Sequence, residues 1–89
     1  MTYNVFLHPK AAKELQDLDA SLRSRVRESL TELRTAPTQM GKQLKGSKYW
    51  SFRVGDYRAI YQILEEDRKV VVLFIGHRSD VYDDFSRAI

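Results

Sequence analysis

The sequence contains no cysteine, which excludes disulfide bonds and thiolate chemistry. It has no apolar run near the roughly 20 residues that span a bilayer, and its first five residues lack the charged and apolar regions of a secretory signal. The two histidines are far apart in the sequence, and the acidic residues lack the spacing of metal ligands. We therefore expect a cytoplasmic protein that needs no metal and no other cofactor.

A chain of 89 residues is also short of material for more than one domain, so we expect a single domain over residues 1–89. A domain of this size buries only about 60–65% of the surface that its unfolded chain exposes. Little remains for a deep substrate pocket. The active surface should be shallow, with much of a substrate's positioning supplied by another molecule. The 43% hydrophobic and 30% charged residues are typical of a soluble globular fold.

The positive charge is concentrated in one part of the chain. The net charge is +3, yet residues 41–64 hold five basic residues and one acidic residue, whereas the remainder holds ten basic and eleven acidic residues. About a quarter of the sequence therefore carries all of the positive excess. This distribution is typical of a surface that binds a polyanion, although a solvated lysine-rich loop explains it equally well.

Hydrophobic periodicity predicts an α+β fold of the order β-α-α-β-β-β-(α), in which the two helices form an antiparallel hairpin. Proline at position 9 favours a first helical turn, and Asp19 or Ser21 is suited to cap the second helix. The predicted elements, in chain order, are a strand at 3–7, a helix from Pro9, a helix that ends at 36–37, a loop at 37–49 with a short strand at 43–45, strands at 50–54, 57–64 and 70–75, and a last helical turn after Ser79 or Asp80.

The predicted hairpin brings two arginines together. Gly55 and Asp56 form a two-residue turn signal, which places Arg53 directly opposite Arg58 on the face away from the core. The core face would hold the apolar partners Trp50, Phe52, Val54, Tyr57, Ala59 and Tyr61. Like charges directly opposite each other destabilise a hairpin. An anion bound between them would explain the pairing.

A third arginine follows from the next turn. A loop centred near Asp67 places Arg58 close to Gly76, with Arg78 just beyond it. Three guanidinium groups would then converge at one end of the sheet, and each has a planar fork of donors suited to phosphate. The alternative is that these arginines form ion pairs on a hydrated surface. Candidate partners are Asp56, Asp80, Asp83 and Asp84.

At these positions the sequence resembles the RelE/ParE toxin family, specifically its RelE-like branch. The similarity covers nearly the whole chain and is carried above all by YRAIY at 57–61 and GHRSDVY at 76–82, in this order and spacing. It implies that the helical hairpin packs on one face of a small antiparallel sheet, a fold similar to small microbial ribonucleases. It also implies a metal-independent toxin that cleaves messenger RNA in the ribosomal A site and is neutralised by a cognate RelB-like antitoxin in a heteromeric complex.

The resemblance assigns roles to individual residues. Arg58 matches the arginine that holds the scissile phosphate, and Arg78 matches the one that acts on the leaving oxygen. Tyr82 matches a tyrosine that stacks on a base. Two lysines of the family, one of them the presumed general base, fall at Ser51 and Arg53. Serine is a poor base and arginine stays protonated, so we assign phosphate binding to Arg53 and phosphate or RNA binding to Ser51.

Proton transfer needs another candidate. His77 is the natural one, because histidine normally titrates near neutral pH, although strand alternation directs His77 and Arg78 to opposite faces. Lys48 is a second candidate, and Lys45 and Lys48 together are predicted to bind RNA.

The missing lysines keep two other functions open. One is a ParE-like protein that inhibits DNA gyrase by binding, without nuclease chemistry. The other is an inactive relative that persists as a partner-binding module. In each case an acidic, partly disordered antitoxin is the expected partner.

Overall fold

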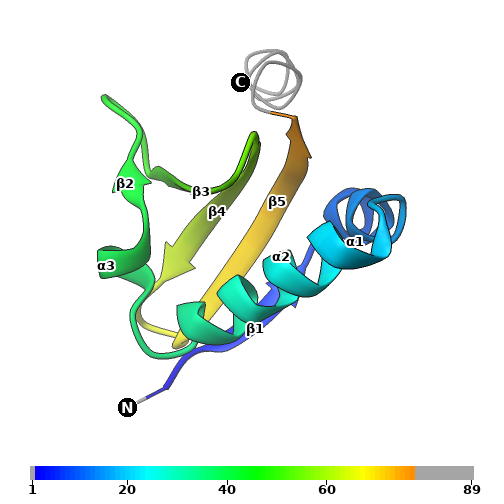
Figure 1. Cartoon of the computed structure of the whole chain (residues 1–89). Helices are drawn as coiled ribbons and strands as arrows, with labels where there is room; N and C mark the ends of the chain where they lie inside the picture. Colours follow the sequence, from blue (N-terminus) through cyan, green and yellow to red (C-terminus); the bar gives the residue numbers. More distant parts are fainter. Residues whose placement is uncertain (1, 78–89) are drawn as a thin grey trace.

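The computed structural model describes residues 2–77, and Figure 1 shows how its helices and strands are arranged. The elements, in chain order, are β1 (Asn4–Leu7), α1 (Pro9–Gln16), α2 (Ala20–Leu33), α3 (Pro37–Met40), β2 (Lys42–Gln43), β3 (Tyr49–Val54), β4 (Tyr57–Leu64) and β5 (Lys69–His77). The predicted helical turn after Ser79 or Asp80 lies outside the described residues.

The strands form one sheet in the order β1-β5-β4-β3-β2, and helices α1 and α2 pack on one of its faces (Figure 1). The predicted α+β fold is therefore confirmed. The sheet is mixed rather than wholly antiparallel, because β1 lies parallel to β5. Strand β4 occupies one edge of β5, so the first strand of the chain pairs with the edge of β5 that remains.

Local signals explain where the helices begin. Pro9 stands in the first turn of α1, and His8 Nδ1 accepts a hydrogen bond of 3.2 Å from the backbone N–H of Lys10. The Asp19 carboxylate accepts one of 2.9 Å from Leu22 N–H, which confirms it as the cap of α2. The predicted loop differs in detail. It contains the short helix α3, and its strand β2 begins one residue before the predicted strand at 43–45.

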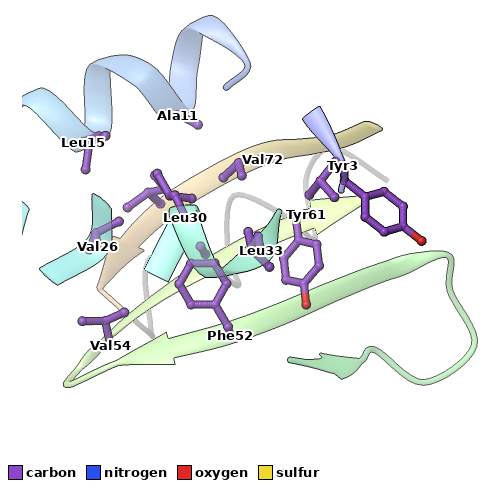
Figure 2. Close-up of a cluster of buried hydrophobic side chains, with 13 residues drawn as sticks. Tyr3, Ala11, Leu15, Val26, Leu30, Leu33, Phe52, Val54, Tyr61 and Val72 are labelled. Carbon is purple, nitrogen blue, oxygen red and sulfur yellow. The ribbon is translucent and has the colours of Figure 1, made fainter. Parts of the chain in front are cut away.

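The core lies between the sheet and the helices, as Figure 2 shows. Side chains from α1 and α2 meet the alternate positions of β3 and β4 that the hairpin pattern predicted. The buried side chains from the helices are Ala11, Leu15, Val26, Leu30 and Leu33, and those from the three central strands are Phe52, Val54, Ala59, Tyr61, Val70, Val72 and Ile75. The aromatic rings of Phe52 and Tyr61 pack together with their centroids 5.9 Å apart.

The register of β3 and β4 confirms the predicted hairpin. Val54 pairs with Tyr57 and Arg53 pairs with Arg58. Gly55 has a φ of 60°, which the two-residue turn requires and glycine adopts without strain.

Strand β5 contains a bulge that the sequence pattern did not predict. Ile60 of β4 pairs with Phe74, but the next residue, Tyr61, pairs with Val72, so Leu73 is an extra residue in the ladder. A bulge of one residue reverses which side chains face the core. Val72 and Ile75 therefore both face the helices, although they are three positions apart.

Helix α3 is held against the sheet by a buried tyrosine. The Tyr61 hydroxyl donates a hydrogen bond of 2.6 Å to the carbonyl oxygen of Pro37, and burial raises the pKa of Tyr61 to about 12. Directly after α3, Gly41 passes so close to β3 that a Cβ atom there would collide with the Ser51 carbonyl oxygen and the Tyr61 hydroxyl. Only glycine lets the chain approach β3 at this point. None of the helices within residues 2–77 is long and apolar enough to cross a membrane.

Candidate functional site

The predicted arginine pair lies on the face of the sheet away from α1 and α2. Arg53 on β3 stands directly opposite Arg58 on β4, and Arg58 in turn stands opposite Gly76 on β5. Cross-strand partners share a face, so the three positions form a row across three strands. Gly76 has no side chain, so the two arginines are the only side chains of this row. The predicted proximity of Arg58 to Gly76 is confirmed.

A hollow of about 240 Å³ opens beside this row. It is lined by Met40, Gly41, Lys42, Ser51, Phe52, Arg53 and Arg58. Three of these residues carry positive charge, and none of these lining residues is acidic. Ser51 is buried, with 5% of the residue's surface exposed, and it forms part of the wall of the hollow.

The turn orients Arg53. Its Nε donates a hydrogen bond of 2.7 Å to the carbonyl oxygen of Gly55, the first residue of the β3–β4 turn. This bond uses one of the five N–H donors of the guanidinium group and leaves the two terminal nitrogens available. Arg53 is exposed, whereas Arg58 is partly buried. The two arginines thus present donors at different depths of one surface.

The two predicted RNA-binding lysines lie nearby but outside this hollow. Lys45 and Lys48 belong to the loop between β2 and β3, which projects from the rest of the chain at the upper left of Figure 1. Residues 43–48 line a second, wider hollow of about 670 Å³. The Lys48 ammonium lies 5.7 Å from the centroid of the Tyr49 ring, within the range of a cation–π contact.

His77 lies on the other face of the sheet from the arginines. It pairs with Tyr57, which follows the hairpin turn, and the two rings meet edge to face with centroids 5.8 Å apart. Since Arg58 pairs with Gly76, strand alternation separates His77 from the arginine row. The predicted proton transfer by His77 stays a prediction, and the register counts against it.

Two predicted site residues, Arg78 and Tyr82, lie outside the described residues. The structure therefore brings together Arg53, Arg58 and Ser51, and it adds one residue that sequence reasoning missed. Lys42 pairs with Ser51 across β2 and β3 and lines the same hollow. The signal for Lys42 was its basic charge, but its place depends on the register of a two-residue strand, which the sequence pattern did not define.

Chemically, a hollow lined by two guanidinium groups, an ammonium group and a hydroxyl group is suited to an oxyanion. Guanidinium forks match the geometry of phosphate oxygens, and none of the residues that line the hollow is acidic. Among residues 2–77, the histidine and acidic side chains form no group of three that could hold a metal ion.

Fold and site together define a small basic α+β domain with a hollow lined by two arginines and a lysine on the face of its sheet away from α1 and α2. A model of the family described as "ParE toxin of type II toxin-antitoxin system, parDE" matches residues 5–82. The chain therefore belongs to this family of RelE/ParE toxins.

Individual relatives agree with this assignment. Toxin RelG of Mycobacterium tuberculosis is 33% identical over 85 residues, which cover 92% of this chain and 98% of RelG. The mRNA interferase toxin RelE of Escherichia coli strain K12 is 28% identical over 94 aligned positions, which cover 100% of this chain and 99% of that toxin. A chain in the crystal structure of the toxin–antitoxin complex RelBE2 from Mycobacterium tuberculosis superposes with a TM-score of 0.81 at 30% identity, covering 86% of this chain and 99% of that one.

Proposed function

We propose that this protein is the toxin of a type II toxin–antitoxin system and that it is an endoribonuclease that cleaves messenger RNA. The observation that carries the proposal is the hollow in which Arg53 and Arg58 stand directly opposite each other with no acidic residue in the lining. The similarity to the mRNA interferase toxin RelE of Escherichia coli supports the same activity. This similarity favours RNA cleavage over DNA gyrase inhibition as the activity of the protein.

The reaction is a transesterification within the RNA. The 2′-hydroxyl oxygen of one ribose forms a bond to the adjacent phosphorus, and the bond from phosphorus to the 5′-oxygen of the next nucleotide breaks. The proton lost by the 2′-hydroxyl is balanced by the proton gained by the 5′-oxygen. The products are a 2′,3′-cyclic phosphate and a free 5′-hydroxyl, and no metal takes part.

Arg58 and Arg53 stabilise the negative charge that develops on the phosphate oxygens during this step. Such electrostatic stabilisation is usually the largest contribution to catalysis of this kind of reaction. Ser51 donates a hydrogen bond from the wall of the hollow. By the family resemblance, Arg78 acts on the leaving oxygen and Tyr82 stacks on a base. Because Ser51 and Arg53 stand where the family has lysines, catalysis depends on charge and alignment more than on a strong base.

A hollow of about 240 Å³ is too small to enclose an RNA strand, so another molecule must hold the RNA in line for attack. We propose that the ribosome does this in the cytoplasm, with Lys45 and Lys48 on the projecting loop contacting nucleic acid. The RelBE2 complex from Mycobacterium tuberculosis contains a similar chain, which supports a cognate RelB-like antitoxin as the stable partner in a heteromeric complex.

Mapping of mRNA 5′ ends after expression without antitoxin tests the proposal. The wild-type protein should produce 5′-hydroxyl ends inside translated codons. Arg58→Gln should abolish these ends, whereas Arg27→Gln, which removes an exposed arginine from α2, should retain them. Circular dichroism and antitoxin binding verify that each variant is folded. Intact mRNA together with a DNA-damage response in the wild type would instead identify a gyrase inhibitor.

A further inference from the structure

We infer that Lys42 is a third phosphate-binding residue of this site, which supplies from β2 the positive charge that Ser51 does not supply from β3. The inference rests on the proposed function for its ligand, an RNA phosphodiester. It concerns a residue to which neither the sequence pattern nor the family resemblance assigned a role.

The position of Lys42 follows from the register. Lys42 pairs with Ser51, and cross-strand partners share a face of the sheet. Ser51 and Arg53 are two positions apart on β3 and therefore share that face as well. Arg53 stands opposite Arg58. The three cations thus occupy adjacent positions on three neighbouring strands, and all three line the hollow of about 240 Å³.

The backbone that carries Lys42 is firmly placed. The residue before it, Gly41, lies against the Ser51 carbonyl oxygen, at a distance that a Cβ atom would prevent. Helix α3, which precedes Gly41, is bound through Pro37 to the buried hydroxyl of Tyr61. Lys42 itself is exposed. A fixed backbone with an exposed ammonium group is the arrangement expected of a residue that binds a ligand from solution.

The side chains differ in what they offer. Each arginine presents a planar fork, which fits two oxygens of one phosphate, whereas lysine acts as a compact point charge. Lys42 approaches from the side of the hollow that Ser51 lines. We therefore place its ammonium on a phosphate oxygen that the two arginines leave exposed. Its role is charge, so arginine at the same position should replace it.

Binding of a short single-stranded RNA tests this role without any cleavage. The probe carries a 2′-deoxy substitution at the scissile position, and its dissociation constant is measured by fluorescence anisotropy over a series of NaCl concentrations. Lys42→Gln should weaken binding about tenfold at low salt, since one charge-assisted hydrogen bond is lost. The slope of log K against log salt should fall by about 0.7, the value for one phosphate contact on a single strand.

Matched variants make the result specific. Lys13→Gln removes an exposed lysine from α1, on the helical side of the molecule, and should behave as wild type. Lys42→Arg should retain both affinity and slope. The double variant Lys42→Gln with Ser51→Lys moves the charge to the facing strand and should restore most of the slope, even though Ser51 is buried.

Three results would overturn the inference: a Lys42→Gln variant that matches Lys13→Gln, a Lys42→Arg variant that loses as much as Lys42→Gln, or a folded double variant that binds no better than Lys42→Gln. Thermal melts identify variants that fail to fold, and Lys42→Arg decides the question should Lys42→Gln be among them. Because the probe cannot be cleaved, this outcome is separate from the proposed function. A wild-type protein that binds the probe through Lys42 but leaves mRNA intact would refute only the nuclease.

Discussion

The pairing of Arg53 with Arg58 makes a quantitative prediction about stability. Directly opposed residues of an antiparallel pair have Cβ atoms about 4.5–5.5 Å apart. Two unit charges about 5 Å apart in a medium like water repel each other by about 0.8 kcal/mol. Long arginine side chains diverge from each other, so this is an upper value. We expect an unfavourable coupling of about 0.5 kcal/mol between the two arginines in 20 mM NaCl.

A double-mutant cycle measures this coupling. The free energies of unfolding of wild type, Arg53→Gln, Arg58→Gln and the double variant are determined by urea denaturation. Removal of either arginine relieves the repulsion, and removal of the second gives no further relief. The double variant should therefore be less stable than the sum of the single effects predicts, by about 0.5 kcal/mol. The cycle cancels the loss of the Arg53 hydrogen bond to Gly55, which occurs in both arms.

Salt and anions separate repulsion from other causes. The Debye length falls to about 3 Å at 1 M salt, so the coupling should nearly vanish there. Inorganic phosphate at the ionic strength of 20 mM NaCl should make the coupling less unfavourable or reverse its sign, since one anion binds both guanidinium groups. A coupling of zero at 20 mM NaCl, or one that phosphate leaves unchanged, would refute the reasoning that this pair is held for an anion.

Three further predictions concern the elements that position the site. Gly41→Ala should destabilise the fold by about 1–3 kcal/mol, because the new Cβ collides with β3; a thermal melt equal to wild type would contradict the close approach. Tyr61→Phe should lose about 1 kcal/mol at pH 7 with the hydrogen bond to Pro37. Burial raises the pKa of Tyr61 to about 12, above the roughly 10 of an unfolded tyrosine. The wild type should therefore lose stability as the pH rises from about 10 towards 12, and Tyr61→Phe should lose less stability over the same range. Parallel pH profiles of the two proteins in urea denaturation would exclude this contribution. Asp19→Ala should cost about 1 kcal/mol by removing the cap of α2, while Asp19→Asn, which keeps an acceptor, should cost much less in the same assay.

The hairpin and the arginine pair were predictable from the sequence, because two local signals agree. The Gly55-Asp56 turn sets the loop length, and the alternation on either side sets which face is buried. Those two facts place Arg53 opposite Arg58 without any knowledge of the rest of the chain, and the structure has this register.

The bulge and the position of Lys42 were not predictable by the same reasoning. Strand β5 is a continuous apolar run, so no alternation marks Leu73 as the extra residue. Strand β2 has two residues, too few for a periodic pattern, and its register depends on Gly41 fitting against the Ser51 carbonyl oxygen. The parallel placement of β1 depends on a contact between distant parts of the chain, which local patterns do not encode.

The pairing of β1 with β5 also constrains the order of events during synthesis. Asn4, near the start of the chain, pairs with Lys69, and β5 separates β1 from every other strand of the sheet. A nascent chain therefore leaves the ribosome with the apolar stripes of α1 and α2 exposed. These stripes can be fully buried only after β5, the last strand that the structure describes, has been synthesised. Contacts between residues so far apart in the sequence slow folding and prolong the exposure of apolar, aggregation-prone surface. The sheet is thus expected to be completed only after β5 has left the ribosome, and until then the protein has no completed sheet with which to act.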